Sequence, residues 1–167
     1  MKVMKCTKKL QALVLAFVMV IGMFAVPVYG KTVKASGVDK ISFEKKDGKK
    51  YGVDEDGNPV SGWSKDKKYY FYKDGELATG IVVIKEKFYC FTANGKFNDA
   101  KTQKIRKAAK YEKPFSALQK LIGKPKKAKY YSGSCYGKGK DGVLTYDGFT
   151  VYTFKPDKGA ELFMGVE

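Results

Sequence analysis

The sequence predicts a mainly β protein in which a short, solenoid-like array of β-hairpin repeats is followed by a small α+β domain. A pattern of roughly twenty residues occurs at positions 62–79 and again at 80–97, and repeats of this length usually form arrays. Each copy carries an aromatic run and closes on Asp74-Gly75 or Asn94-Gly95, pairs that favour tight hairpin turns. After residue 114 the pattern changes to one helix followed by strands, which indicates the α+β domain.

Residues 1–35 have the pattern of a signal peptide. Four lysines occur in the first nine residues, and positions 10–26 form an apolar run without charge. Small residues allow cleavage after Gly30 or after Ala35, and we expect cleavage after Ala35. The alternative is an uncleaved membrane anchor, because the run approaches the length that spans a bilayer. We expect a secreted or cell-surface protein without a transmembrane span after cleavage.

The chain is strongly basic, with a formal net charge of +16. All acidic residues follow residue 35, so removing the six lysines before residue 36 leaves a net charge of +10. In an exported protein this charge favours anionic wall polymers, acidic glycans or lipid headgroups over nucleic acid. The alternative is that the lysines only keep a secreted protein soluble.

The hairpin array is predicted for residues 36–98. Residues 41–43 alternate apolar and polar side chains and form a lead-in strand. Residues 51–61 are a degenerate copy of the repeat, with Val53 where the later copies have phenylalanine. Aromatic residues fit a pleated strand. Stacking then buries the aromatic face that a single hairpin would leave in water.

An acidic cluster at residues 54–58 suggests calcium, because hard cations bind alternating oxygen ligands beside a glycine. The glutamate that closes a calcium loop is missing, since residues 63–65 are Trp-Ser-Lys. Asp, Gly and Asn are also the usual residues of turns. We therefore expect a turn here, and we expect neither a metal nor a cofactor.

The repeats resemble the cell-wall-binding repeats of Gram-positive surface proteins, a family that includes the choline-binding modules. They are also similar to the short repeats of large clostridial toxins. Both copies match at the opening Gly, at the closing Asp/Asn-Gly and at a Tyr-x-Phe strand core, which is Tyr69/Phe71 in one copy and Tyr89/Phe91 in the other. The resemblance covers residues 41–97.

This resemblance implies that aromatic rings form the ligand site. In choline-binding modules, rings of adjacent repeats enclose a quaternary ammonium by cation–π attraction. Trp63 and Phe88 match the box positions, whereas Ile81 replaces the second Trp and Lys68 replaces a ring. A lysine there would repel choline, so we expect at most a partial cage of Trp63 with Phe88 or Tyr89. The candidate ligand-binding residues are Trp63, Tyr69, Tyr70, Tyr72, Phe88 and Tyr89.

The same rings could instead stack on sugar faces while Tyr and Lys bond the hydroxyls, as the resemblance to toxin repeats implies. Rings that alternate along a strand also pack between hairpins. For a single ring, packing is the favoured interpretation. For Trp63 we expect ligand contact.

Residues 99–114 are predicted to be a basic linker or a solvent-exposed helix. The segment holds six basic residues and few apolar ones, so its apolar stripe is too narrow to pack firmly. A basic segment at a membrane surface is the alternative, although such segments need larger apolar residues.

Residues 115–167 form the predicted α+β domain, with one helix on a three- or four-stranded antiparallel sheet. Apolar residues at helical spacing occupy positions 115–122, before Gly123. Strand-like runs follow at 129–131, 143–155 and 162–166, and Asp147-Gly148 divides the second run into a hairpin.

This order of elements is similar to the small α+β modules of β-lactamase-inhibitory-protein-like and outer-membrane-lipoprotein-like domains. The resemblance implies protein–protein contact without catalysis. About fifty residues bury little core alone, so we expect this unit to dock onto the repeats or onto a protein partner.

Cys90 and Cys135 remain after export and could form a disulfide that ties the array to the terminal unit. Alternatively, Cys90 replaces a tyrosine of the repeat family as a small apolar residue.

The chain contains no histidine, which removes Ser-His and Cys-His nucleophile pairs and the commonest metal ligand. The glycine-rich segment 137–142 lacks the Gly-Lys-Ser/Thr ending of a phosphate loop. We therefore expect a protein that is not an enzyme.

The sequence thus predicts an exported surface protein whose repeats bind cell-wall polysaccharide or a teichoic-type polymer. The alternative is a secreted protein-interaction or inhibitor-like module in which the repeats are a spacer.

Overall fold

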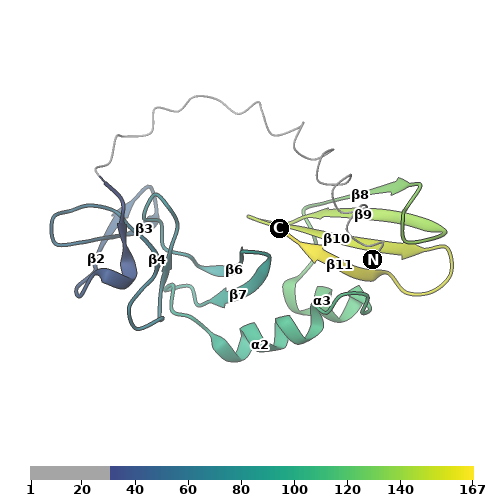
Figure 1. The fold of residues 1–167 in the computed structure, drawn as a ribbon, viewed down its shortest axis with the longest axis horizontal. Coiled ribbons are helices and arrows are strands. Elements are labelled where there is room, and N and C mark those ends of the chain that lie inside the picture. Colours follow the sequence, from purple (N-terminus) through teal and green to yellow (C-terminus); the bar gives the residue numbers. More distant parts are fainter. Residues whose placement is uncertain (1–30) are drawn as a thin grey trace, which may run out of the picture.

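The computed structural model describes residues 31–167, so the predicted signal peptide lies outside the described residues up to residue 30. Hairpins occupy one end of the longest axis and a C-terminal sheet the other (Figure 1). Between them lie the hairpin of β6 (Gly80–Ile84) and β7 (Lys87–Phe91) and helix α2 (Asp99–Ala108). The predicted fold class, a hairpin array followed by a small α+β unit, is confirmed. Among residues 31–167, no helix is long and apolar enough to cross a membrane.

The N-terminal region consists of short strands paired in hairpins. β2 pairs with β3 and β4 pairs with β5, both antiparallel, and β1 lies parallel to β4. The elements are β1 (Val33–Lys34), the 3-10 helix η1 (Ala35–Gly37), β2 (Ser42–Lys46), β3 (Lys49–Val53), β4 (Val60–Trp63) and β5 (Tyr70–Phe71).

Successive hairpins are connected by backbone hydrogen bonds from the turn that follows each strand pair. The Leu77 N–H donates to the Lys50 carbonyl at 2.8 Å and the Gly52 N–H donates to the Gly75 carbonyl at 2.9 Å, so the chain leaving β5 returns to β3. At the next turn, Gly95 has a φ of +78°. A Cβ there would lie 2.3 Å from Leu77 Cδ2, so both the conformation and the space require glycine. The predicted Asp-Gly and Asn-Gly turns are therefore present and join the hairpins.

The first described residues belong to this array. The Val33 N–H donates to the Pro59 carbonyl at 3.0 Å, and Ala35 is fully buried in a cluster with Val60 and Phe71. Cleavage after Ala35, the position expected from the sequence, would remove both contacts. A cut after Gly30 would leave both contacts in place.

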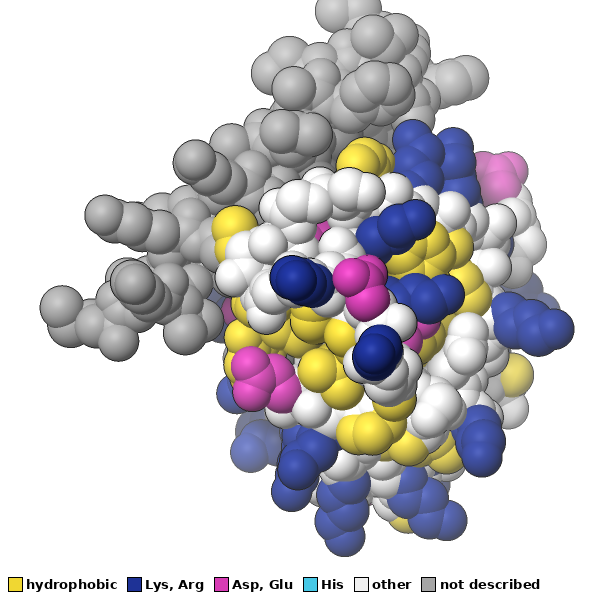
Figure 2. Space-filling view, turned by 90° about the vertical axis from the view of Figure 1, so that its right-hand side faces the viewer, with side chains coloured by type: hydrophobic (Ala, Val, Ile, Leu, Met, Phe, Trp, Pro, Cys, Tyr) yellow, Lys and Arg dark blue, Asp and Glu magenta, His cyan; other side chains and the backbone are white. Residues whose placement is uncertain are grey.

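The C-terminal unit is a four-stranded antiparallel sheet with strand order β11-β10-β9-β8. Its hairpin at Asp147-Gly148 joins β9 to β10, and the rings of Tyr146 and Phe149 stack across that turn at 4.9 Å. Figure 2 shows this end of the molecule, where Lys and Arg side chains surround a partly hydrophobic surface. The elements are α3 (Phe115–Ile122), β8 (Lys127–Ser132), β9 (Gly139–Thr145), β10 (Thr150–Pro156) and β11 (Leu162–Val166).

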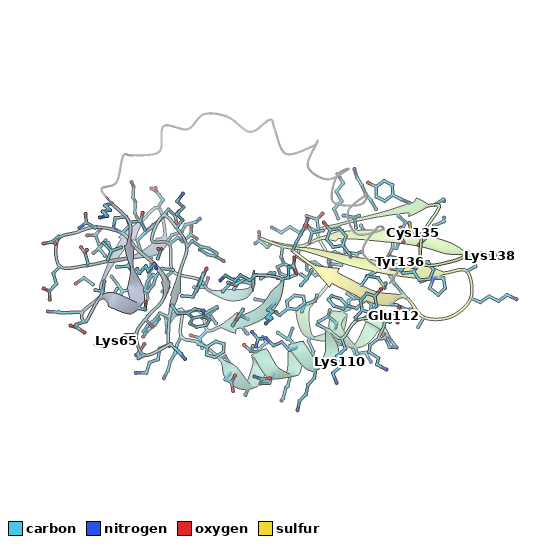
Figure 3. All side chains as sticks on the ribbon, in the orientation of Figure 1. Lys65, Lys110, Glu112, Cys135, Tyr136 and Lys138 are labelled. Atoms are coloured by element: carbon cyan, nitrogen blue, oxygen red, sulfur yellow. The ribbon has the colours of Figure 1, made fainter. Side chains whose placement is uncertain are left out.

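The loop between β8 and β9 carries Cys135 and Tyr136 (Figure 3). The Tyr136 ring packs 5.8 Å from that of Phe154. The helix and four strands agree with the expected element order, while the likeness of this unit to inhibitor-like modules stays a prediction.

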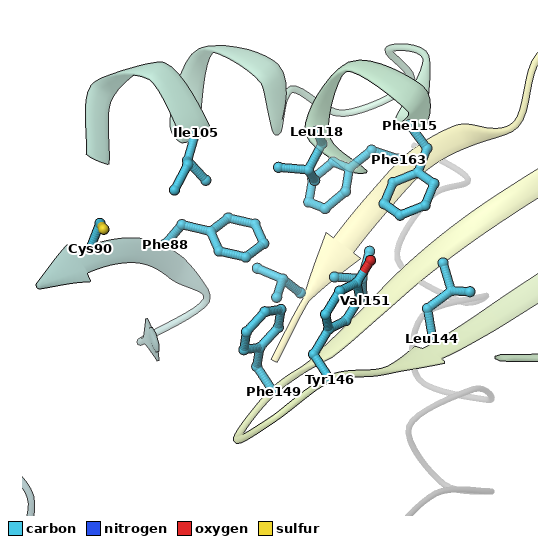
Figure 4. Close-up of a cluster of buried hydrophobic side chains, with 11 residues drawn as sticks. Phe88, Cys90, Ile105, Phe115, Leu118, Leu144, Tyr146, Phe149, Val151 and Phe163 are labelled. Carbon is cyan, nitrogen blue, oxygen red and sulfur yellow. The ribbon is translucent and has the colours of Figure 1, made fainter. Parts of the chain in front are cut away.

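The β6–β7 hairpin faces two cores. Phe88 and Cys90 lie in one core with Leu118 and Val151 of the C-terminal unit, as Figure 4 shows. The alternate residues Tyr89 and Phe91 pack on the opposite side, in the cluster of the repeats. Alternate side chains of a strand point to opposite faces, so this one hairpin joins the array to the C-terminal unit.

Residues 99–108 form the helix that was one of the two alternatives expected for this segment, but it is packed more firmly than a solvent-exposed helix. Asn98 caps the helix by accepting the Lys101 N–H at 2.9 Å. Thr102 and Ile105 are fully buried, and the Thr102 hydroxyl accepts the Cys90 N–H at 2.9 Å. The apolar stripe is narrow, as the sequence indicated, yet Ile105 lies in the core with Phe88 and Cys90 of β7, and Ala108 and Ala109 pack against the same core.

We expect Ile105→Ala to lower the free energy of unfolding by about 2–5 kcal/mol, the usual cost of deleting a fully buried aliphatic side chain. Urea unfolding followed by circular dichroism measures this. Lys104→Ala is the matched control, because Lys104 is exposed on the same helix. Equal midpoints for the two variants would contradict firm packing of α2.

Candidate functional site

The predicted box residue Trp63 lies at the centre of an aromatic cluster. Its ring lies 5.5 Å from Tyr70, 5.3 Å from Tyr89, 5.7 Å from Phe91 and 5.3 Å from Phe97, measured between centroids. Trp63 itself is half-buried. Four ring neighbours from three hairpin segments make this tryptophan chiefly a packing residue, with only part of its surface left for a ligand.

Tyr89 lies next to Trp63, as the partial cage requires, but its ring has a second neighbour. The guanidinium carbon of Arg106 lies 4.2 Å from the centroid of the Tyr89 ring. In an aromatic cage, a cationic ligand would occupy the face of such a ring. Here the Arg106 guanidinium of the protein itself makes this cation–π contact. Tyr89 therefore already has a cation as partner.

Phe88 does not form a cage with Trp63, which corrects that part of the prediction. It points to the opposite side of β7, where its ring lies 5.6 Å from Phe149 and 6.4 Å from Phe163. Only 2% of Phe88 is exposed. The alternation of strand side chains, which separates neighbours in sequence, is the physical reason.

A second group of rings is more open to solvent. Phe43 on β2 is 47% exposed, and its ring meets that of Tyr69 edge to face, with centroids 5.4 Å apart and planes at 66°. These two rings line a concave site of about 340 Å³ between the lead-in hairpin and residues 64–69. Its other lining residues are Val38, Asp39, Ile41, Ser64, Lys65 and Asp66. We call this the Phe43–Tyr69 site.

The charges of the Phe43–Tyr69 site are balanced. Lys65 Nζ lies 2.6 Å from an Asp39 carboxylate oxygen, and Lys68 Nζ lies 2.9 Å from Asp66. The predicted repulsion of a cation by Lys68 is therefore offset by Asp66. Donors and acceptors beside two rings suit a polyhydroxylated ligand, whose hydroxyls both donate and accept hydrogen bonds.

Ser64 positions both Asp66 and Tyr69. Its hydroxyl donates to an Asp66 carboxylate oxygen at 2.7 Å and accepts the Tyr69 N–H at 3.0 Å. The hydrogen bond from Ser64, followed by those from Lys68, lowers the pKa of Asp66 to about 2. The carboxylate thus stays ionised throughout the ordinary pH range.

The remaining predicted rings are Tyr70 of β5 and Tyr72, which follows this strand directly. Tyr72 is 38% exposed and Tyr70 is half-buried, with their rings perpendicular and 6.0 Å apart. Tyr70 also contacts Trp63. They form a further partly open aromatic surface, separate from the Phe43–Tyr69 site, whose lining includes neither.

The predicted Cys90–Cys135 disulfide is not formed. Cys90 is a free, buried thiol on β7 in the core beneath α2, whereas Cys135 lies in the β8–β9 loop (Figure 3). Burial raises the pKa of the Cys90 thiol. The alternative interpretation, a small apolar side chain replacing a tyrosine, fits this environment.

Asp39, Phe43 and Asp66 were not identified as site residues from the sequence. The prediction of site residues followed the aromatic run of each repeat. The lead-in strand precedes the first copy, so its residues were not included. The turn at Ser64-x-Asp66 could have been predicted from the sequence, since Ser and Asp side chains often bond neighbouring backbone groups in turns.

The acidic cluster at residues 54–58 forms a turn. An Asp54 carboxylate oxygen accepts the backbone N–H groups of Asp56 at 3.0 Å and Asn58 at 2.8 Å. Within residues 31–167, no group of three or more acidic or cysteine side chains is arranged to hold a metal ion.

Comparison with known proteins gave limited similarity. No protein-family model and no curated protein matches the chain. Among solved structures, choline binding protein F of Streptococcus pneumoniae is similar at 21% sequence identity and a TM-score of 0.32. That match covers 77% of this chain and 37% of the other. At this level the likeness assigns neither a fold nor a ligand.

We expect Ser64→Ala to raise the pKa of Asp66 from about 2 towards its ordinary value of 3.8, because the largest stabilising hydrogen bond is lost. A lowered pKa means that Asp66 contributes stability at pH values above 3.8, and that this contribution is lost as the pH falls through 3.8 towards 2. Carbon-13 NMR titration of the Asp66 carboxyl measures the shift. Ser42→Ala, at an exposed position, should leave it unchanged; an unaltered titration in Ser64→Ala would disprove the assigned cause.

Proposed function

We propose that this chain is an exported, non-catalytic surface protein whose hairpin repeats bind a polysaccharide of the bacterial cell wall. The observation that carries the proposal is the Phe43–Tyr69 site, where an exposed ring and a half-buried ring adjoin paired carboxylates and ammonium groups. An aromatic face supplies apolar contact to the C–H face of a sugar, and the flanking charged groups bond its hydroxyls.

The balance of charge at this site favours a neutral sugar over an isolated cation. A quaternary ammonium would find the carboxylates of Asp39 and Asp66 already paired with lysines, and it could gain only the ring contacts. Choline is therefore the less favoured ligand, in agreement with the departures of the repeats from the choline-binding pattern.

A teichoic-type polymer is the second candidate wall ligand, and the excess of lysine favours it. Lysines are exposed along β8 and its neighbours, and Figure 2 shows basic side chains around the end of the C-terminal sheet. Attraction between exposed charges is weakened by salt, since the screening length is about 8 Å at physiological ionic strength. The two ligands therefore differ in their sensitivity to salt.

The experiment is a depletion assay of the exported protein on purified Gram-positive cell walls. We expect binding that survives high salt and resists choline. Phe43→Ala should weaken binding about fivefold, because a lost aromatic contact of roughly 1 kcal/mol corresponds to that factor. Phe43 suits this test better than Trp63, since it is 47% exposed and its removal leaves the packing around Trp63 unchanged.

Tyr131→Ala is the matched control, because Tyr131 is 44% exposed on the C-terminal sheet. Elution by salt alone would support the teichoic-type polymer, and elution by choline would support an aromatic cage. Equal binding by the two variants, or no binding by the unaltered protein, would contradict the sugar site. The latter result would favour the alternative in which the repeats are a spacer for a protein-interaction module.

A further inference from the structure

A cavity of about 330 Å³ lies where the β6–β7 turn, α2 and β11 meet. It shares no lining residue with the Phe43–Tyr69 site. Phe88, Phe163 and Val166 provide apolar lining, and Arg106 provides a cationic group. This volume is at the lower end of the range for small-molecule pockets, roughly 300–1,000 Å³.

Arg106 is held in place by two contacts. Its Nε donates to the Phe88 carbonyl at 2.8 Å, and its guanidinium lies over the Tyr89 ring. Arg106 is the single arginine of a chain that otherwise uses lysine for positive charge. A planar guanidinium can stack on a ring while offering further donors, which a lysine ammonium cannot do in the same way.

One nitrogen of this guanidinium has no acceptor. Nη2 of Arg106 is buried, and it has no hydrogen-bond partner among the described residues. Nη2 has almost no accessible surface, so it does not itself face the cavity. The cationic residues of the lining are Arg106 and the exposed Lys87, and such cations suit a ligand that brings a carboxylate.

The other charged groups of the cavity point to a second feature of the ligand. Glu86 and Glu167 are exposed, and Glu167 also accepts a hydrogen bond from the Tyr152 hydroxyl. Asp141 accepts from Ser134 at 2.6 Å. The lining thus holds three carboxylates and two cations, Arg106 and Lys87, so a ligand that carries both an ammonium and a carboxylate matches it better than a simple anion or a simple cation.

We propose that this cavity binds a small zwitterion, namely an amino acid or dipeptide with an apolar side chain. Its carboxylate lies near Arg106 and Lys87, its ammonium lies near the exposed Glu86 and Glu167, and its side chain contacts Phe88, Phe163 and Val166. This site is independent of the wall-binding function proposed for the hairpins.

The test is calorimetric titration of the exported protein with L-phenylalanine and L-alanyl-L-phenylalanine. Two analogues isolate the charges, since 3-phenylpropionate lacks the ammonium and phenethylamine lacks the carboxylate. We expect saturable binding of at least one zwitterion and at least tenfold weaker binding of each analogue. No saturable binding of either zwitterion, or equal binding of 3-phenylpropionate, would overturn the proposal.

Two variants test whether the ligand binds in this cavity. Arg106→Lys keeps a positive charge but loses the planar donor group, and it should weaken binding at least tenfold. Because Arg106 also contacts Tyr89 and Phe88, its loss could disturb the fold, so Gly165→Leu provides a second test. Gly165 lines the cavity, and a Cβ added there meets no atom within 4 Å, so the larger side chain fits the backbone and fills space that the ligand needs.

Gly37→Leu is the matched control, because a Cβ at Gly37 also meets nothing within 4 Å and this glycine lies in η1, among the hairpins. Thermal unfolding of all variants confirms that each is folded. Loss of binding in Gly165→Leu but not in Gly37→Leu supports the site. Unchanged binding in a folded Gly165→Leu variant would overturn it.

Discussion

The structure depends on one strand that packs on both of its sides. β7 sends Phe88 and Cys90 into the core of the C-terminal unit and Tyr89 and Phe91 into the cluster of the repeats. β6 does the same, with Ile81 and Val83 on one side and Val82 and Ile84 on the other. A small sheet with one helix has little apolar surface to bury by itself. The rings of this hairpin complete its core, and the array and the sheet therefore stabilise each other.

This shared hairpin explains why the aromatic residues of the repeats are not equally available. Near β7, rings are used to hold segments together, and even the exposed side of Tyr89 is covered by Arg106. Farther from the junction, at the lead-in hairpin, Phe43 contacts the rings of Tyr69 and Phe71 on one side only and is 47% exposed. A stacked array leaves its most open aromatic surface at its free end, because each repeat is covered only by its neighbours.

Arg106 connects the two sides of the hairpin through a single side chain. It bonds the backbone of Phe88 and stacks on Tyr89, which face different cores. The lysines have a different role: where they meet carboxylates they do so at the surface, as in the pairs with Asp39 and Asp66. Exposed pairs of this kind add little stability, so these lysines shape the electrostatic character of the proposed binding surface more than they hold the fold.

Much of the fold followed from local chemistry. The Asp-Gly and Asn-Gly turns, the helix before Gly123 and the strands on either side of Asp147-Gly148 depend on neighbours within a few residues, and periodicity was enough to predict them. Tyr69 was likewise identified from the repeat pattern. These features are encoded by backbone preference and by side chains close in sequence.

Only the tertiary structure decided which side chains meet. Phe88 and Tyr89 are adjacent in sequence yet lie in different cores, and Cys90 is buried away from Cys135. Helix α2 is held against β7 by the buried Thr102 and Ile105 together with Arg106. Phe43 joins Tyr69 although 26 positions separate them in the sequence. Such contacts depend on how hairpins are placed against each other, and no periodicity within a single segment contains that information.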